Sequence, residues 1–276
     1  MSATEARKST LLAGKRGLVL GVANNRSIAW GIAKAAHDAG AELAFTYQGE
    51  SLEKRVRPLA AELGAMVVGH CDVTEPATID AVFSEIEKAW GQIDFVIHCI
   101  AFSDKDELTG RYVDTSADNF SRSMLISCYS FTAIAQRAEK LMKDGGSMLT
   151  LTYYGAEKWM PHYNVMGVAK AALEASVRYL AADLGPKNIR INAISAGPIK
   201  TLAASGIGDF RYILKWNEFN APLRRTVTIE EVGDTAVYLV SDMGRGMTGE
   251  ILHVDAGYHV VGMKNPEAPD ITLDKA

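Results

Sequence analysis

Short apolar runs alternate with longer amphipathic segments along the whole chain, and this alternation constrains the fold more than any other feature of the sequence. It is typical of repeated strand–helix–strand units arranged around a parallel sheet. Several runs are apolar without interruption, as expected of strands that helices cover on both faces. Seven strands are predicted, at Arg16–Val22, Glu42–Tyr47, Met66–Cys71, Asp94–Cys99, Ser147–Thr152, Arg190–Ser195 and Glu250–Val254.

Two of the segments between these runs show clear helical spacing. Apolar side chains recur every three or four positions over residues 79–90, and Gly91 follows as a helix stop. A second stripe, rich in small residues, covers residues 169–181 and ends before Gly185 and Pro186. This second helix packs either on its own sheet or against a neighbouring subunit. We therefore predict a single α/β domain over residues 1–276, a Rossmann-like doubly wound parallel sheet of about seven strands with helices on both faces.

The composition narrows the range of partners and compartments. Of the 276 residues, 48% are hydrophobic, enough for a large core, and the formal charge of -4 gives no overall basic field for nucleic acid or anionic lipid. The apolar stretch at residues 18–23 is far shorter than the roughly 18 residues that suggest a membrane span. Three widely spaced cysteines, with no CxxC pair and no secretory leader, favour a reducing, cytoplasmic location. We expect no nucleic-acid or membrane partner, and we expect the polar ends, residues 1–13 and 264–276, to be the most mobile parts.

The loop from Gly21 to Ala29 is a candidate site for a dinucleotide diphosphate. It joins the first predicted strand to a helix, and helix N-termini present unpaired N–H groups and the positive end of the helix dipole to anions. Only the first glycine of a G-x-x-x-G-x-G spacing is present, because Asn25 and Ser27 occupy the other two positions. Asn tolerates the left-handed backbone region, and Ser is a favoured N-cap that can also donate to phosphate. The alternative is a simple strand-to-helix turn capped by Ser27.

Residues at the ends of the next strands point to the rest of a dinucleotide. Gln48 stands where such folds usually place a carboxylate against the adenosine ribose, and although this Gln is neutral, the nearby Glu50 would repel a 2′-phosphate, which favours NADH. Asp72 could accept from the adenine amino group or only cap a turn. Two pairs, His70–Cys71 and His98–Cys99, resemble metal ligands, but each ends a predicted buried strand. We interpret them as core residues and predict no metal.

Tyr163 and Lys170 form the most specific pattern in the chain. They are seven residues apart, nearly two helical turns, so both side chains face the same way about 10 Å apart along the helix axis. Common short-chain dehydrogenases separate the two residues by four, and that pattern fails in this chain. One helix face therefore carries an acid and a cation at an altered spacing.

Taken together, these residues resemble bacterial NADH-dependent enoyl-acyl-carrier-protein reductases, a divergent branch of the short-chain dehydrogenase/reductase superfamily. The likeness extends from about Leu12 to Gly262, and the spacing of Tyr153, Tyr163 and Lys170 is its most specific element. It also rests on the Gly21–Ala29 loop, Gln48, Cys71–Asp72–Val73, the Tyr163–Gly167 run and the segment Pro198–Ala203.

The resemblance implies a reaction and a role for each residue. Hydride would pass from NADH to the β-carbon of a trans-2-enoyl thioester. Tyr163 would donate to the enolate oxygen, Lys170 would hold the nicotinamide ribose, and Tyr153 would line the acyl pocket near the reacting end. The implied cofactor-binding residues are Gly21, Ser27, Ile28, Gln48, Asp72, Val73, Ile100, Lys170, Ile199 and Thr201. The implied substrate-binding residues are Ala101, Tyr153, Tyr163, Met166, Ile207 and Phe210.

The resemblance also implies partners. The family is usually tetrameric, and its acyl carrier protein is acidic, so a cationic rim is expected. Arg211, Lys215, Arg224 and Arg225 are the candidates, unless they are solvated or form intrachain pairs. Residues 201–220 have weak periodicity, which predicts a lid that is mobile without cofactor.

Two other functions fit the same scaffold. A short-chain ketoreductase or alcohol dehydrogenase is disfavoured by the failed Tyr–Lys spacing. A dinucleotide-binding regulator without turnover is disfavoured by the intact Tyr153, Tyr163 and Lys170.

Overall fold

One parallel sheet organises the chain in the computed structural model, which describes residues 10–202, 204, 208 and 210–271. In this part of the chain the strand order is β3-β2-β1-β4-β5-β6-β7, and every neighbouring pair is parallel. The strands are β1 (Arg16–Leu20), β2 (Glu42–Tyr47), β3 (Met66–His70), β4 (Phe95–His98), β5 (Gly146–Thr152), β6 (Ile189–Ala196) and β7 (Ile251–Val254). All seven predicted strands are confirmed, within one residue at every end except the end of β1. That strand stops early because Gly21 turns the backbone to a φ of 97°.

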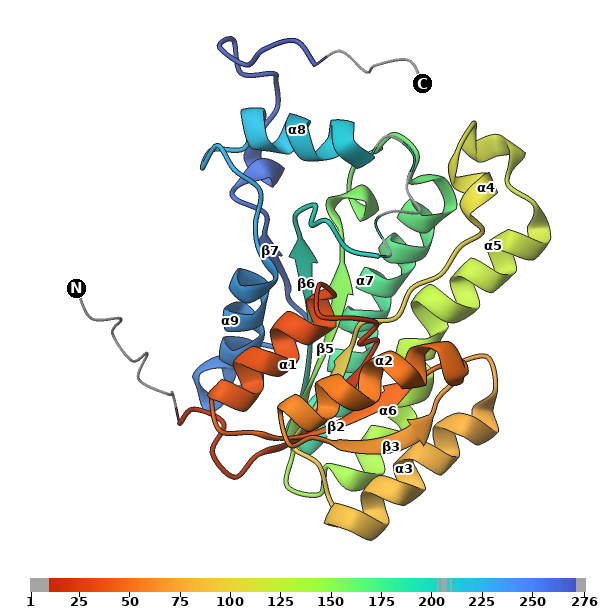
Figure 1. Cartoon of the computed structure of the whole chain (residues 1–276), viewed down its shortest axis with the longest axis vertical. Coiled ribbons are helices and arrows are strands. Elements are labelled where there is room, and N and C mark those ends of the chain that lie inside the picture. The colour runs from red at the N-terminus through yellow and green to blue at the C-terminus, as the bar shows by residue number, and fades with distance from the viewer. Residues whose placement is uncertain (1–9, 203, 205–207, 209, 272–276) are drawn as a thin grey trace.

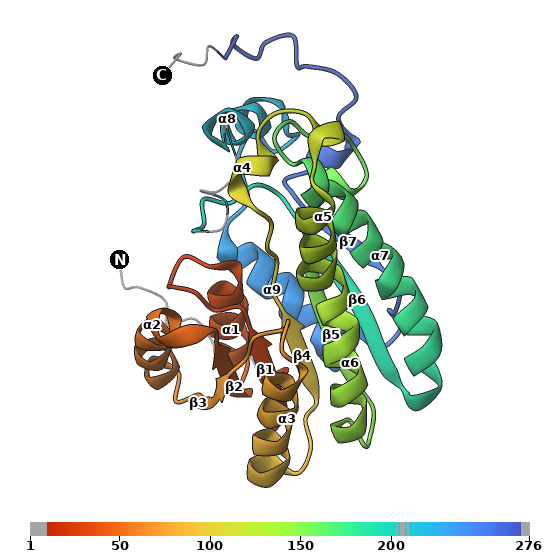
Figure 2. The same ribbon diagram turned by 90° about the vertical axis from the view of Figure 1, so that its right-hand side faces the viewer.

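Helices cover both faces of the sheet, as a doubly wound fold requires (Figures 1 and 2). One face carries α1 (Ile28–Asp38), α2 (Gly49–Glu62) and α9 (Ile229–Val240). The other carries α3 (Pro76–Trp90), α6 (Ser130–Leu141) and α7 (Asn164–Leu184). The remaining α-helices of the described residues are α4 (Lys105–Leu108), α5 (Ala117–Met124), which continues through a π-turn at Leu125–Tyr129 into α6, and α8 (Phe210–Asn220).

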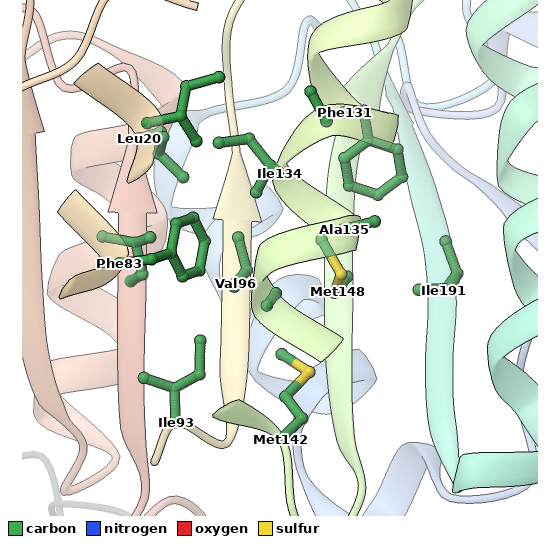
Figure 3. Close-up of a cluster of buried hydrophobic side chains, with 14 of the residues drawn as sticks. Leu20, Phe83, Ile93, Val96, Phe131, Ile134, Ala135, Met142, Met148 and Ile191 are labelled. Atoms are coloured by element: carbon green, nitrogen blue, oxygen red, sulfur yellow. The ribbon is translucent and has the colours of Figure 1, made fainter. Parts of the chain in front are cut away.

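The two faces of the sheet explain the uninterrupted apolar runs. Side chains alternate along a strand, so Leu18 and Leu20 pack beneath α3 and α6 while Val19 packs on the opposite side with α1. Figure 3 shows part of the first cluster, in which Phe83 and Ile134 meet Val96 of β4. A strand buried on both faces has no exposed positions, so its sequence shows no polar alternation.

Both predicted helix ends are confirmed. Helix α3 ends at Trp90, and Gly91 follows in the left-handed conformation. Helix α7 ends at Leu184, directly before Gly185 and Pro186.

Residues 210–220 form helix α8 rather than an aperiodic segment. Its buried positions include Asn217 and Asn220, whose side chains donate to the carbonyls of Ile213 and Trp216. Because these polar side chains are buried through bonds to their own helix, the apolar period is weak although the helix is regular. Residues 203, 205–207 and 209 lie outside the described residues, and the mobility of this segment stays a prediction.

Candidate active site

Two adjoining cavities lie where the carboxyl ends of the strands meet. The larger, about 460 Å³, is lined by residues after β1, β2, β3 and β4. The smaller, about 340 Å³, is lined by residues after β5 and β6, by the first turns of α7, and by α8. Ala101 and Phe102 line both, so the cavities share a wall. Residues of α4 and α8 line the smaller cavity. The direction in which successive strands are added to the sheet reverses between β1 and β4, where doubly wound folds bind dinucleotides.

Gly21 brings the end of β1 against the end of β4. A Cβ atom at this position would lie 2.1 Å from the carbonyl oxygen of Cys99, and the positive φ adds strain for any other residue. The close approach leaves the strand end open to the larger cavity, which Gly21 lines. A side chain at the first glycine of the predicted loop would therefore collide with the backbone at the end of β4.

The rest of the loop differs from the prediction in two details. Asn25 is not among the described residues with a positive φ, so the expected left-handed backbone at this position is wrong. Ser27 precedes α1 as its N-cap, but its hydroxyl donates to the carbonyl of Asn24 at 2.7 Å and does not cap the helix. Asn24 also accepts the Arg26 N–H through its side chain, which keeps the loop in a compact right-handed turn. Ser27 lines neither cavity.

Gln48 and Asp72 form a pair at the outer part of the larger cavity. The Gln48 amide donates to one oxygen of Asp72 at 2.8 Å, and the other oxygen accepts the backbone N–H and hydroxyl of Thr74. Although partial burial raises the pKa of Asp72, the hydrogen bonds from Thr74 and Gln48 bring it below its ordinary value. The carboxylate is thus ionised and caps the turn after β3, the simpler of the two roles considered for it.

The two His–Cys pairs behave differently from one another. His98 is fully buried, with Thr150 Oγ1 3.0 Å and Ser130 Oγ 2.8 Å from its two ring nitrogens, and burial lowers its pKa to about 3. Burial raises the pKa of Cys71 to about 12. The core interpretation is confirmed for these two, but it is wrong for His70, which is exposed at the end of the edge strand β3 and accepts the Gly49 N–H. The part of the chain described shows no group of three or more side chains arranged to hold a metal.

Tyr153, Tyr163 and Lys170 meet in the smaller cavity. The rings of Tyr153 and Tyr163 pack edge to face with their centroids 5.0 Å apart. Lys170, two turns into α7, is buried and its Nζ donates to the Leu151 carbonyl at 2.8 Å. The prediction that the Tyr and the Lys face the same side is confirmed.

A sharp turn presents Tyr163 at the start of α7. The residues on either side of it, His162 and Asn164, both have a positive φ. The Asn164 amide donates to the carbonyls of Glu107 and Leu108, which ties this turn to α4. The backbone strain is therefore offset by bonds that hold the phenol in place.

Burial sets the charges of all three side chains. It raises the pKa of Tyr153 and Tyr163 above their ordinary values, so both phenols are protonated. It lowers the pKa of Lys170 to about 8, so the amine is cationic only below that pH. The hydroxyl of Tyr153 is buried and has no hydrogen-bond partner among the described residues. A buried donor of this kind is available to a ligand.

Most of the other predicted site residues line one of the two cavities. Gln48, Asp72, Val73, Ile100 and Ala101 line the larger, and Ile28, Ala101, Met166, Ile199, Thr201 and Phe210 line the smaller. Ile207 lies outside the described residues. The cavities also include residues that the sequence analysis missed: Phe102, Arg122 and Ile126 on the larger, and Phe102, Leu108 and Ile213 on the smaller. Phe102 follows a predicted strand end and could have been found, but Arg122 and Ile126 carry no such signal.

Two of the four arginines and lysines proposed for a cationic rim are engaged within the chain. Arg225 makes a bidentate pair with Glu231, and Arg224 donates to the carbonyls of Asn220 and Ala221. The intrachain alternative is therefore confirmed for these two. Arg211 and Lys215 are exposed on α8.

The fold and the site together define a Rossmann-type dinucleotide-dependent reductase scaffold with a Tyr–Lys pair. The sequence profile of the family described as enoyl-(acyl carrier protein) reductase matches residues 21–259, and the chain belongs to this family. A relative from Rhizobium meliloti named enoyl-(acyl-carrier-protein) reductase (NADH) 1 is 74% identical, covering 98% of this chain and 99% of the relative. A Rickettsia felis protein of the same activity name is 60% identical over 91% of this chain and 97% of its own length.

Solved structures agree with this assignment. The reductase of Anaplasma phagocytophilum in complex with NAD superimposes with a TM-score of 0.91 at 60% identity, over 96% of this chain and 99% of that one. The Bacillus cereus enzyme with NADP+ and an indole naphthyridinone gives a TM-score of 0.90 at 57% identity, over 92% and 99%. Within the described residues, none of the helices combines the length and the apolar character that crossing a membrane requires.

Proposed function

We propose that this chain uses NADH to reduce the trans-2 double bond of enoyl thioesters carried by acyl carrier protein. The observation that carries the proposal is the meeting of Tyr163 and Lys170 in one cavity that adjoins a second cavity at the ends of β1 and β4. NADH, when bound, supplies the hydride. The names of the relatives support both the reaction and the cofactor.

The larger cavity fits the adenosine and diphosphate of a dinucleotide. Gly21 keeps the strand end free of side chain where the diphosphate would pass. Gln48 and Asp72 would bind the adenosine part, and the ionised Asp72 beside a neutral Gln48 disfavours a 2′-phosphate. Ile199 and Thr201 in the smaller cavity would contact the nicotinamide end. These contacts favour NADH over NADPH.

Two side chains would stabilise the charge that develops on the thioester oxygen as the β-carbon accepts hydride. The protonated phenol of Tyr163 donates a hydrogen bond to that oxygen, and a preorganised donor in a water-poor cavity stabilises an oxyanion more strongly than water does. Lys170 adds a positive charge. A lysine ammonium has three N–H donors, and the Leu151 carbonyl accepts one, so the others can hold the ribose hydroxyls. Tyr153 supplies a second phenol against the acyl group.

The spacing of Tyr163 and Lys170 favours alkene reduction over ketone reduction. Met166, an apolar residue, stands four positions before Lys170, where common short-chain dehydrogenases carry their Tyr. A donor moved almost one turn away suits a thioester oxygen, which is three bonds from the β-carbon that receives hydride and so two bonds farther from it than the oxygen of a ketone is from its carbonyl carbon. A ketoreductase needs its donor on the reacting carbonyl itself.

One assay separates the three candidate functions. Purified protein mixed with NADH and a crotonyl thioester is expected to consume the absorbance of reduced nicotinamide, whereas a β-ketoacyl thioester is not. Consumption with the β-ketoacyl thioester alone would identify a ketoreductase. Binding of NADH without turnover of either thioester would identify a regulator.

We also propose a homotetramer and a docking rim for the carrier protein. Apolar side chains are exposed on the π-turn and α7, at Leu125, Tyr129, Val168 and Tyr179. Light scattering is expected to give about four times the chain mass of 29.8 kDa, and a single-chain mass would exclude the assembly. Replacing Arg211 and Lys215 with Ala is expected to raise KM for carrier-protein thioesters but not for small thioesters; equal effects would exclude the rim. The reducing, cytoplasmic location stays a prediction.

A further inference from the structure

The wall between the two cavities is a stretch of chain without regular secondary structure. Residues 101–104 follow β4 and precede α4. Phe102 lines both cavities, and Ser103 and Lys105 line the smaller one. The backbone of this wall cannot bond to a neighbouring strand, so its N–H and C=O groups need other partners.

Two side chains of α5 and the following π-turn, Asn119 and Ser127, bond to this backbone, and a third on the same line, Ser123, contacts the side chain of Ser103. Ser127 Oγ accepts the Phe102 N–H at 2.9 Å and donates to the Phe102 carbonyl at 3.0 Å. Asn119 Oδ1 accepts the Asp104 N–H at 3.0 Å and the Ser103 hydroxyl at 3.3 Å. Ser123 Oγ lies 3.0 Å from Ser103 Oγ. We name Asn119, Ser123 and Ser127 the polar row.

The spacing and the burial of the polar row set it apart from ordinary polar residues on a helix. Its members are four residues apart and fully buried. On an α-helix a four-residue repeat drifts around the axis, because one turn has 3.6 residues. The π-turn at Leu125–Tyr129 has i→i+5 bonds and thus a wider turn, which counteracts the drift before Ser127. The row therefore faces the wall along its length.

One member of the row, Asn119, and a neighbouring residue of α5, Arg122, make further contacts around the wall. The Asn119 amide donates to the Glu107 carboxylate at 3.2 Å, and that carboxylate accepts the backbone N–H and the hydroxyl of Ser116. The Arg122 guanidinium pairs with Asp104 and lies over the Phe102 ring from the exposed side of the same helix. A buried side chain of α5, Asn119, and an exposed one, Arg122, therefore both hold the wall at Asp104.

We propose that the polar row positions the wall for catalysis, with Ser127 as its main positioning residue. Both polar atoms of the Phe102 backbone are bonded to one hydroxyl, so Ser127 determines how far the wall stands from Tyr163 across the smaller cavity. The row acts mainly on the binding of the acyl thioester, because the proposed adenosine contacts, Gln48 and Asp72, follow β2 and β3 and do not belong to the wall. This inference rests on the proposed function.

The test compares Ser127→Ala with Ser147→Ala. Ser147 is also buried, on β5 at the opposite end of the sheet, and its hydroxyl donates to the Leu239 carbonyl. Loss of two hydrogen bonds to the wall in Ser127→Ala is expected to raise KM for a crotonyl thioester about tenfold, with kcat and the Kd for NADH changed by less than about threefold. Ser147→Ala is expected to lower stability without changing KM. Amide exchange at residues 101–104 is expected to accelerate in Ser127→Ala only.

Ser123→Ala provides a graded second variant. Ser123 contacts the Ser103 side chain rather than the wall backbone, so a smaller rise in KM is expected. An unchanged KM in Ser127→Ala, or an equal rise in Ser147→Ala, would overturn the positioning role. Absence of turnover in the unmodified protein would instead refute the proposed function, so the two failures are distinguishable.

Discussion

Burial shifts the pKa values of the two central side chains of the site, Tyr163 and Lys170, in opposite directions. It disfavours the charged form of each, so the pKa of Tyr163 rises while that of Lys170 falls to about 8. The phenol therefore stays a hydrogen-bond donor at all ordinary pH values. The amine, in contrast, titrates close to neutrality. Desolvation therefore keeps the Tyr163 phenol protonated across the ordinary pH range, and it makes the charge of Lys170 depend on pH near 8.

Tyr163→Phe removes the donor and keeps the ring. The expected result is a loss of about 100-fold in the rate of hydride transfer, because one preorganised oxyanion donor is gone. The Kd for NADH is expected to change little. Single-turnover measurements of NADH oxidation check the rate, and Tyr238→Phe, at an exposed tyrosine of α9 that lines neither cavity, is the control. Turnover equal to that of the unmodified protein would remove Tyr163 from the mechanism.

The charge of Lys170 predicts the alkaline limb of the pH profile. Below a pH of about 8 the amine is cationic and can stabilise the developing enolate; above it the amine becomes neutral. We therefore expect kcat/KM for the thioester to fall as pH rises through about 8, since this parameter reports the free enzyme. Initial rates measured across this range check the prediction. A profile that stays flat to about pH 10 would contradict it.

At the scale of elements, the close approach of β1 to β4 depends on one residue. Gly21→Ala would place a methyl group 2.1 Å from the Cys99 carbonyl and in an unfavourable backbone region. A loss of at least about 1–3 kcal/mol of unfolding free energy is expected from the backbone strain alone, together with weaker NADH binding. Urea unfolding and NADH titration measure the two effects.

Gly64→Ala is the matched control for this change. Gly64 also has a positive φ, but a Cβ atom there would have no neighbour within 4 Å. Gly64→Ala is expected to lower the free energy of unfolding only by the cost of the backbone strain, and to leave NADH binding intact. Equal effects of the two substitutions would show that the contact with Cys99 is unimportant.

The elements that the sequence predicted, and those that it missed, differ in how their polar residues are satisfied. The seven strands were predictable because their buried faces are apolar. Helix α8 was not, because Asn217 and Asn220 are buried through bonds to their own helix. The polar row was missed for a related reason, since Asn119, Ser123 and Ser127 are buried but polar and add nothing to an apolar pattern. When a polar side chain is buried through hydrogen bonds, whether to its own helix or to a distant segment, it leaves no apolar period in the sequence.

The site residues follow the same rule. Tyr163 and Lys170 could be paired because they are close in the sequence, at the N-cap and in the second turn of α7, where helical spacing predicts the side that each faces. The roles of Asp72 and Ser27 could not be decided, since their partners Thr74, Gln48 and Asn24 compete for the same polar atoms that a ligand would use. The prediction that His70 is buried was wrong because β3 is an edge strand, and the order of strands in a sheet cannot be inferred from the local sequence.

At the scale of the whole molecule, a histidine buried in the centre of the sheet makes the folding stability depend on pH. His98 lies there, at the end of β4, between Thr150 of β5 and Ser130 of α6. Burial holds its pKa at about 3, below the ordinary value of 6.5. The unfolded chain therefore binds a proton below about pH 6.5 that the folded protein does not, and folding stability falls with pH from about 6.5 towards 3.

This one imidazole is expected to remove about 2 kcal/mol of unfolding free energy between about pH 7.5 and about pH 5. Urea unfolding at the two pH values measures the loss. His98→Gln keeps a polar side chain of similar length but cannot titrate in this range, so its loss between the two pH values is expected to be smaller by that amount, even if it is less stable at both. His70→Gln, at an exposed histidine, is expected to behave like the unmodified protein. If His98→Gln lost as much stability as the unmodified protein, the acid sensitivity would have to come from groups outside the buried centre of the sheet.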